Sequence, residues 1–560
     1  MSMSMLNFEK ANKYFWWTLV ILSFVYAAWY SLLGYDNLVL WYMNSHPHFY
    51  KDDVWSKDFF TRGTYSFGVW YSWLLVCLLL FITIARRYYK ENIVTSPFHF
   101  QKTFTQVGIG IFFLSVTILW LWQSKADYAT DEIFSAVHFA EKPLVLTISH
   151  YPLPNNHIFF NVLNHFMGWA SEDLVITGRL ISVVSVALTM MFIYGFTSEY
   201  IKGTFANLCI ILLLLSVFPL FGFGTQARGY GIHIFLSWMT FLSLFTYFKH
   251  KANGSLQMYT ISVVLGLWTM PSFLYYWVGI SLTLLIFMLK EHRLDKAVVY
   301  STFKILVLTA LLYMPAITFS GVKAIFGNKY VSASKVTYGD FLSNLFSDNY
   351  FQGLFNEWFG TGQQVWLAII ILLIPFGFYL VTKQKIILHW CFYIFCFGFT
   401  LLLMIILMKK FPFYRNLVSH GLMFWVFFLL ISGYFVENVK SKLKPIWMGI
   451  ILSISVYFTF LNTQRYPFHL YYYDVNAWNQ PINEADLTDL AQKRVFIHDE
   501  SFFWDPAVKK VTSTITHGAT VLTHADYIIM DSIRSKAINL QEWEMHNQVG
   551  ETIFWKRKIQ

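Results

Sequence analysis

Residues 173–198 read DLVITGRLISVVSVALTMMFIYGFTS, one of the long apolar runs on which the fold of this chain depends. About 20 apolar residues of helix cross the ~30 Å hydrocarbon layer of a bilayer, where only helices and closed barrels satisfy their backbone polar groups. The apolar residues are continuous rather than alternating, so the run predicts a transmembrane helix. Arg179 is costly in lipid, and we expect it to face protein and pair with Glu172 or Asp173.

Similar runs recur along the chain and predict an all-α polytopic membrane protein with about thirteen transmembrane helices. Of the 560 residues, 56% are hydrophobic and only 13% are charged, against about 25% charged in a soluble domain. The first run follows Lys10 and Lys13 and lacks a small-residue cleavage site, so we interpret it as a retained signal anchor. The predicted spans are 14–34, 65–85, 103–122, 173–198, 203–221, 229–248, 257–270, 272–290, 298–320, 363–382, 386–408, 417–436 and 445–462.

Lysine and arginine set the predicted orientation. They gather in the segments that are cytoplasmic when the N-terminus is inside, as at Arg86, Arg87, Lys249 and Lys251. The C-terminus is then outside, and four long segments, 35–64, 123–172, 321–362 and 463–560, lie on the outer side. The net charge of +10 follows this topology and is not a nucleic-acid signal.

The four cysteines all fall inside predicted spans, at Cys77, Cys209, Cys391 and Cys396. Their positions are typical of small buried hydrophobic residues and not of a disulfide framework or a metal site.

The tail from residue 463 differs in composition, with 10 basic and 12 acidic residues among its 98. Strand-like runs at 495–498, 527–530 and 552–555 alternate with polar helical stretches, which predicts a small extracytoplasmic α/β domain. We therefore divide the chain into two N-terminal helices with the first outer loop (1–102), a transmembrane module containing outer loop 123–172 (103–462), and the α/β domain (463–560).

Acidic residues follow the third span, at Asp127, Asp131 and Glu132. A carboxylate held next to an acceptor hydroxyl can take its proton as a new bond forms, so the pair offers a general base. Alternatively, Asp131 and Glu132 only begin a helix, where acids favour the positive end of the dipole. The run 132–141 predicts a short amphipathic helix with Ile133, Phe134 and Val137 towards the lipid.

Two histidines flank a Pro-rich turn in the same loop. His150 precedes the turn, and His157 opens a second short helix, predicted over 158–169 at the membrane interface. Either histidine could orient or protonate a phosphate or bind a metal. No HxxxH-like ligand pair accompanies them, so no metal site is predicted. The alternative is that each bonds a loop or a helix start.

Cations on the outer side are disfavoured by the positive-inside rule, yet Lys409, Lys410 and Arg415 form a compact outer cluster. Arg228 stands at the outer end of another span. Such cations suit a lipid-linked phosphate, because arginine binds phosphate oxygens bidentately. Snorkelling at the interface is the alternative.

The order of these pieces resembles the GT-C membrane glycosyltransferases. The resemblance rests on the Asp-Glu pair after a span, the Pro-rich stretch, a helix beginning Asn156-His157-Ile-Phe-Phe, and Gly168…Glu172…Arg179-Leu-Ile-Ser. Thr225-Gln-Ala-Arg228-Gly-Tyr230 and Pro412-Phe-Tyr-Arg415 are similar to later motifs of the superfamily. The similarity covers residues 103–436 and is closest to protein O-mannosyltransferases and bacterial aminoarabinose lipid A transferases. Two additional spans precede it, and Asn155-Asn156-His157 stands where some relatives have an acid-lysine pair.

This resemblance implies an inverting single displacement of a sugar from a polyprenyl-phosphate donor to a protein or cell-envelope glycolipid acceptor, at the periplasmic face of a bacterial inner membrane. It implies Asp131 as the base with Glu132 assisting. Donor, acceptor and membrane lipids are the expected partners, without nucleic acid and without a predicted cofactor. Arg228, Arg415, His157, Lys409 and Lys410 would hold the donor phosphate, and Tyr230, His150, Asn156 and Asp127 would contact substrate.

Three other functions fit a polytopic membrane protein. A transporter or flippase needs ionisable residues near the bilayer midplane, and the chain has almost none there and no inverted repeat. A structural subunit of an envelope assembly would use the long loops only to bind partners. A lipid-linked glycan ligase or polymerase would depend on outer arginines without the early Asp-Glu pair.

Overall fold

The computed structural model describes most of the membrane part and a portion of the tail. The predicted spans 363–382 and 417–436 lie outside the described residues, as does all of 386–408 except residues 406 and 407, and so do Asp127, Lys409, Lys410 and Arg415. The main described ranges are 3–45, 59–85, 102–123, 128–151, 156–199, 203–215, 222–250, 253–290, 295–326, 444–464, 487–497, 525–531, 541–549 and 552–558.

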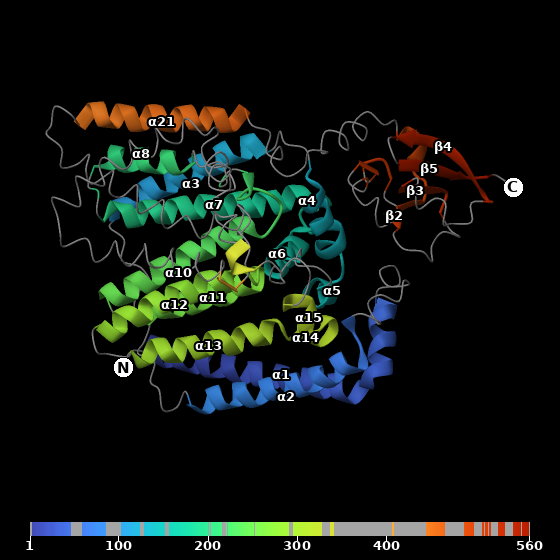
Figure 1. Cartoon of the computed structure of the whole chain (residues 1–560), viewed down its shortest axis with the longest axis horizontal. Helices are drawn as coiled ribbons and strands as arrows, with labels where there is room; N and C mark the ends of the chain where they lie inside the picture. The colour runs from blue at the N-terminus through green and yellow to red at the C-terminus, as the bar shows by residue number, and fades with distance from the viewer. Residues whose placement is uncertain are drawn as a thin grey trace.

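Long apolar helices form at ten of the predicted spans and run side by side (Figure 1). By length and composition, five described helices can cross a membrane, or six if α13 and α14, bent by 47°, count as one span. The molecule is therefore a helical membrane protein with several apolar spans. The ten comprise α1 Met3–Ser45, α2 Arg62–Ala85, α3 Lys102–Gln123, α7 Leu174–Ser198, α8 Thr204–Leu215, α10 Tyr230–His250, α11 Asn253–Thr269, α12 Phe273–Lys290, the pair α13 Lys296–Leu312 and α14 Met314–Ser320, and α21 Lys444–Gln464.

Large apolar side chains are exposed on the outer faces of these helices. Leu32 of α1 is 85% exposed, and Phe113 of α3 and Phe460 of α21 are exposed as well. Cys77 lies inside the predicted span as a free thiol, but on the exposed face of α2, so the prediction that it is a buried residue is wrong. Hydropathy alone does not separate a lipid-facing position from a protein-facing one, because both exclude water.

Short helices gather at one end of the bundle (Figure 1). They are α4 Thr130–Ser135, the π-helical turn η2 Ala136–Ala140, α5 Leu144–Ser149, α6 Ile158–Met167 and α15 Val322–Phe326. The helix predicted over 158–169 is confirmed as α6. Ile133 and Val137 are only 3% and 2% exposed, so the prediction that they face lipid is wrong. Helices α6 and α7 pack against η2 and cover that side.

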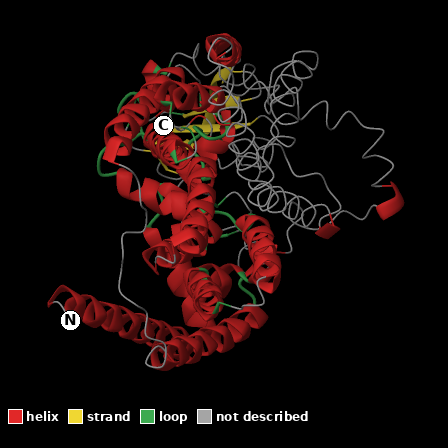
Figure 2. Cartoon of the chain, turned by 90° about the vertical axis from the view of Figure 1, so that its left-hand side faces the viewer, coloured by secondary structure: helices red, strands yellow, loops and turns green. Residues whose placement is uncertain are grey.

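A break at Gly34 divides α1, where φ is +76°, a conformation that glycine adopts readily. The predicted first span ends at this residue, but helix continues to Ser45 beyond the break. That second half packs with α2, α5 and α14 around Tyr30, Tyr42 and Phe319. The Tyr30 hydroxyl donates to the Thr318 carbonyl at 2.9 Å. The pair α1 and α2 thus forms one edge of the helical part and is bonded to it (Figures 1 and 2).

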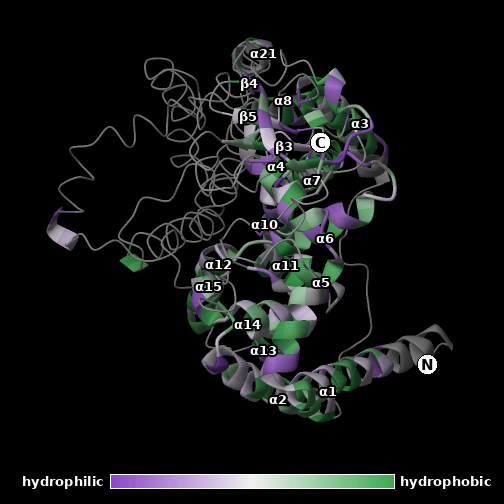
Figure 3. Cartoon of the chain, turned by 90° about the vertical axis from the view of Figure 1, so that its right-hand side faces the viewer, coloured by the Kyte–Doolittle hydropathy of each residue, from purple (hydrophilic) through white to green (hydrophobic). Residues whose placement is uncertain are grey.

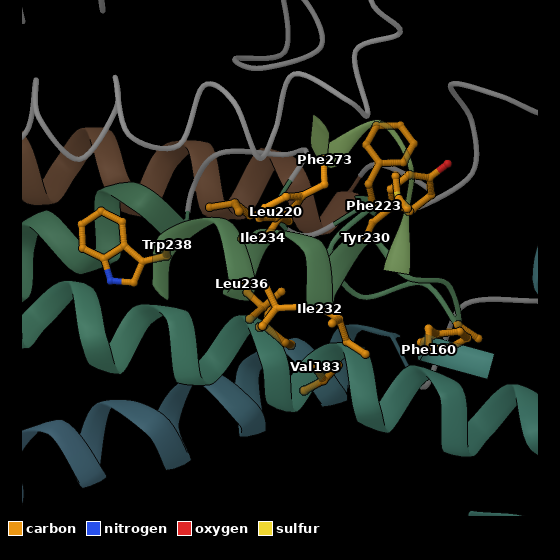
Figure 4. Packing of buried hydrophobic residues seen from close by; sticks show 14 of the residues in the cluster. Phe160, Val183, Leu220, Phe223, Tyr230, Ile232, Ile234, Leu236, Trp238 and Phe273 are labelled. Atoms are coloured by element: carbon orange, nitrogen blue, oxygen red, sulfur yellow. The ribbon is translucent and has the colours of Figure 1, made fainter. Parts of the chain in front are cut away.

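The main core lies between α7, α10 and α11. Val183 of α7 lies near Ile232 and Leu236 of α10 (Figure 4). Gly231 allows this approach, since a Cβ there would stand 2.8 Å from the Ser182 carbonyl oxygen. A larger residue would push α10 away from α7 and displace the turn that precedes α10.

The tail contains a five-stranded mixed sheet with the order β2-β1-β3-β5-β4. Strands β2, β1 and β3 are parallel, and β5 pairs antiparallel with β3 and β4. The strands are β1 Val495–Ile497, β2 Ile515–Thr516, β3 Tyr527–Asp531, β4 Trp543–Val549 and β5 Thr552–Arg557. The three predicted runs are confirmed as β1, β3 and β5. The sequence analysis missed β2, which has two residues, and β4, which is mostly exposed.

The sheet lies at the same end of the bundle as α4, α5 and α6 (Figures 1 and 3). The second half of α1 and α15 are also at this end, whereas the N-terminus is at the other (Figure 1). The second half of α1, the helices α4 to α6, α15 and the sheet therefore share one end of the molecule, and they come from the four long segments predicted to share one side (Figure 1).

Candidate active site

The turn formed by residues 225–229, just before α10, is the meeting point of the site. It is tight, since the Arg228 N–H donates to the Gln226 carbonyl at 2.6 Å. Side chains from four separate elements bond to this turn and hold it in place. These bonds are Thr225 Oγ1 to Gln123 Oε1 at 3.1 Å, Ala227 N to Glu132 Oε1 at 2.6 Å, Ser182 Oγ to the Arg228 carbonyl at 3.1 Å and Gly229 N to His157 Nδ1 at 2.9 Å.

Asp131 and Arg228 form an ion pair across this meeting point. Asp131 Oδ2 lies 2.5 Å from a terminal nitrogen of Arg228, and the side chains are 27% and 2% exposed. Arg228 also lies over the Tyr230 ring, 5.6 Å from its centroid. The structure thus brings together the predicted base and one predicted phosphate ligand. Asp131 alone of this pair presents a substantial surface to its surroundings.

Glu132 has a different environment from its neighbour. It is completely buried and accepts from Arg179 Nε at 3.0 Å and from the Arg179 terminal nitrogen at 2.6 Å. Its remaining bonds come from the backbone N–H groups of Ala227 at 2.6 Å and Ala129 at 2.9 Å. Two bonds to each carboxylate oxygen use both of its lone pairs, so Glu132 keeps no acceptor for a substrate proton. The geometry therefore favours a positioning role for Glu132 over the predicted assistance in catalysis.

Arg179 faces protein as predicted, but its predicted pairing with Glu172 or Asp173 is wrong. Asp173 instead caps α7, accepting from the backbone N–H groups of Val175 and Ile176. Asp173 also accepts a 2.5 Å bond from the Tyr128 hydroxyl. Burial, together with the Asp173 carboxylate, raises the pKa of Tyr128 and keeps this hydroxyl a neutral donor. Asp173 thus has its own partners, and Arg179 reaches across to α4.

His157 and Tyr230 pack against each other beside the ion pair. Both are buried, at 3% and 6% exposure, and their ring centroids are 5.2 Å apart. Tyr230 is also in edge contact with Phe223 (Figure 4). A Cβ at Gly229 would stand 2.9 Å from the His157 Cβ, so only glycine fits at this position without a shift.

His150 and Asn156 lie in a polar network between α5 and α6 and are both buried. The Asn156 amide donates to the carbonyls of His150 at 2.6 Å and Thr147 at 3.0 Å, and its oxygen accepts from Asn161 at 2.9 Å. These bonds anchor the start of α6 and thereby His157. A direct substrate contact by His150 or Asn156 stays a prediction.

No group of three His, Cys, Asp or Glu side chains within the described ranges is arranged to hold a metal ion. The roles predicted for Asp127, Lys409, Lys410 and Arg415 stay predictions, because those residues are outside the described part of the chain.

Sequence reasoning missed Gln123, Ser182 and the Glu132–Arg179 pair as parts of the site. One signal was available for Asp173, which directly precedes an apolar run and is a favoured residue for capping a helix. Assigning Asp173 to the cap would have left Arg179 in need of another acid. Nothing local marks Gln123 or Ser182, since polar residues near helix ends are common.

These features define a class: a multi-pass helical membrane protein with a small mixed sheet and a buried ion-pair cluster at one end of its bundle. Among solved structures, the chain is similar to ArnT from Cupriavidus metallidurans, crystallised with undecaprenyl phosphate. The TM-score is 0.51 at 9% identity, over 81% of this chain and 97% of ArnT. No protein-family model and no curated protein sequence matches the chain. At this identity the likeness establishes the fold alone, and the predicted GT-C resemblance is confirmed at that level.

Proposed function

We propose that this protein is a glycosyltransferase that moves a sugar from a polyprenyl-phosphate donor to a protein or cell-envelope glycolipid acceptor. The reaction takes place on the extracytoplasmic face of a bacterial inner membrane, at the end of the bundle where Asp131 lies. Support comes from the ArnT-like fold, because ArnT was crystallised with undecaprenyl phosphate.

The observation that carries the proposal is the pairing of a partly exposed Asp131 with a buried Arg228. A nearby cation favours the ionised form of a carboxylate, which is the form that can accept a proton. The surrounding bonds to the 225–229 turn hold both side chains on a rigid frame. A rigid frame suits a reaction in which a hydroxyl and an anomeric carbon must be brought together.

In the proposed reaction, the acceptor oxygen forms a bond to the anomeric carbon while the bond from that carbon to the phosphate oxygen breaks. The acceptor proton passes to the Asp131 carboxylate, and polyprenyl phosphate leaves with the electron pair. Attack from the face opposite the phosphate inverts the anomeric configuration. The lipid tail requires that the donor be met at the membrane boundary.

Arg228 has two roles in the proposed reaction. It orients Asp131, and its five N–H donors are enough to contact a phosphate oxygen in addition to the carboxylate. Glu132 and Arg179 position the turn without touching substrate. The additional phosphate contacts predicted for Arg415, Lys409 and Lys410 belong to the same hypothesis.

The test compares Asp131→Asn with wild type in a deletion strain, using mass spectrometry of envelope glycans and glycoproteins. Wild type restores a sugar-bearing product, and Asp131→Asn lowers its initial rate of formation by about 100-fold or more, the usual contribution of a general base. The matched control is Asp36→Asn, because Asp36 is an exposed aspartate paired with Arg62 away from this site. Wild-type rates in Asp131→Asn would refute the catalytic assignment.

A further inference from the structure

Two histidines, the N-cap residue of α6 and a residue in its last turn, bond through the same ring atom to opposite kinds of partner. His157 Nδ1 lies 2.9 Å from the Gly229 backbone nitrogen, which is a donor. His165 Nδ1 lies 2.8 Å from the Ala140 carbonyl oxygen, which is an acceptor. His157 has the non-helical backbone of the N-cap and His165 lies within the helix, but it is the bonding partner of each Nδ1 that differs in kind, one a donor and the other an acceptor.

The partner determines where each ring carries its proton. A backbone N–H can only donate, so Nδ1 of His157 must present its lone pair, and the neutral ring carries hydrogen on Nε2. A carbonyl can only accept, so Nδ1 of His165 carries hydrogen. His157 is therefore a neutral ring with an Nε2–H donor, and protonating Nδ1 would break its bond to the turn.

The surroundings of His157 also oppose a second positive charge. The ring is 3% exposed, and the neighbouring Arg228 already balances the charge of Asp131, so a further cation would have no counter-charge in this pair. His157 further stands at the start of α6, where helix backbone N–H groups carry partial positive charge. The same features attract an anion, for which a neutral N–H donor is a compatible ligand.

We propose that the Gly229 N–H holds His157 as the neutral Nε2–H tautomer and that this N–H donates to a phosphate oxygen of the polyprenyl-phosphate donor. This inference rests on the proposed function and specifies how the phosphate is bound. His157 is then a hydrogen-bond donor throughout turnover, and neither an acid nor a base. The Gly229 contact is what sets its donor direction.

Two substitutions of His157 test the roles of its two ring nitrogens separately. In His157→Asn the side-chain oxygen takes the place of Nδ1 and accepts from Gly229, but the donor at Nε2 is lost. In His157→Gln the amide nitrogen takes the place of Nε2, but the acceptor for Gly229 is lost. The same two changes at His165 are the matched controls, because His165 lies in the helix that His157 caps and has the reverse tautomer.

The experiment measures binding of undecaprenyl phosphate to the detergent-solubilised full-length protein, together with its thermal unfolding. His157→Asn is expected to weaken binding by about tenfold or more, the usual effect of a lost bond to a charged group, with little change in unfolding temperature. His157→Gln is expected to bind within about threefold of wild type and to unfold at a lower temperature. The His165 variants bind like wild type.

Nitrogen-15 NMR of histidine-labelled protein reads the tautomer independently of function and is expected to show hydrogen on Nε2 of His157. Wild-type affinity in His157→Asn, or hydrogen on Nδ1, would overturn the inference while leaving the proposed function intact. Failure of the wild-type protein to bind undecaprenyl phosphate would overturn both.

Discussion

At the scale of single residues, Asp131 and Glu132 show how two adjacent acids acquire different roles. Successive side chains on a helix point about 100° apart, so one acid can face the surroundings while the next faces the core. Asp131 is 27% exposed beside Arg228, whereas Glu132 is sealed against Arg179. The Asp-Glu pair therefore combines one candidate base with one residue that holds the frame.

Removing Glu132 is expected to destabilise the protein more than breaking an exposed ion pair does. Glu132→Ala leaves Arg179 as an uncompensated buried charge, which costs about 3–5 kcal/mol. Thermal unfolding in detergent should show a large decrease in midpoint, and Glu132→Ala combined with Arg179→Met should recover much of it. Arg62→Ala is the control, because its pair with Asp36 is 73% exposed on both sides and should change the midpoint little. An equal decrease in both single variants would contradict the assignment.

At the scale of elements, the 225–229 turn organises the site although it is neither helix nor strand. Helices α3, α4 and α7 and the start of α6 each contribute one bond to it, so it sets their relative positions. Gly229 is essential to this arrangement, since its missing Cβ makes room for His157 and Thr269. The short helices of the outer loop are thereby fastened to the membrane bundle through one small segment.

Gly229→Ala is expected to destabilise the protein by about 1–3 kcal/mol, because the added methyl group overfills a packed site. Its Cβ would lie 2.8 Å from a Thr269 methyl group. Binding of undecaprenyl phosphate should weaken together with stability, since the shift displaces His157. Gly110→Ala in α3 is the control, with no atom within 4 Å of the new Cβ, and alanine there favours helix. Equal unfolding midpoints in the two variants would contradict this account.

At the scale of the whole molecule, the two N-terminal helices are part of the fold and not an appendage. Tyr26 bonds the Thr318 hydroxyl at 2.6 Å and Tyr42 bonds the Ser149 hydroxyl at 3.0 Å. Ser149 and Ser320 are themselves joined at 2.8 Å, next to the segment that leads to His150. The N-terminal pair therefore supports α5 and α14 from behind the site.

Tyr30→Ala is expected to lower stability by about 3–5 kcal/mol, as for other large buried aromatic residues. Tyr30 has no exposed surface and its ring contacts those of Phe60, Tyr65 and Phe319. A single cooperative thermal transition at a lower midpoint is expected. Leu32→Ala on the exposed face of the same helix should change the midpoint little. A separate early transition in Tyr30→Ala would indicate that the N-terminal helices unfold on their own.

Much of the fold was predictable because the signals are local. The ends of α2, α3 and α7 fall within three residues of the predicted spans 65–85, 103–122 and 173–198. The strands β1, β3 and β5 were located by their apolar runs. Which helix faces meet lipid was not predictable, as Cys77 and Ile133 show, because the positions that face lipid and those that face protein are both apolar.

The amino-acid sequence was enough to show a polytopic membrane protein with a small α/β domain after its last helix, because apolar runs of bilayer length are excluded from water in any fold. It also singled out Asp131, Arg228 and His157 as candidates for chemistry. Their bonding partners depend on the packing of distant segments: Glu132 is bonded by Arg179, 47 residues away, and by Ala227, 95 residues away. Hydrogen bonds and ion pairs act over about 3 Å, so they depend on which distant segments pack together and not on neighbours along the chain.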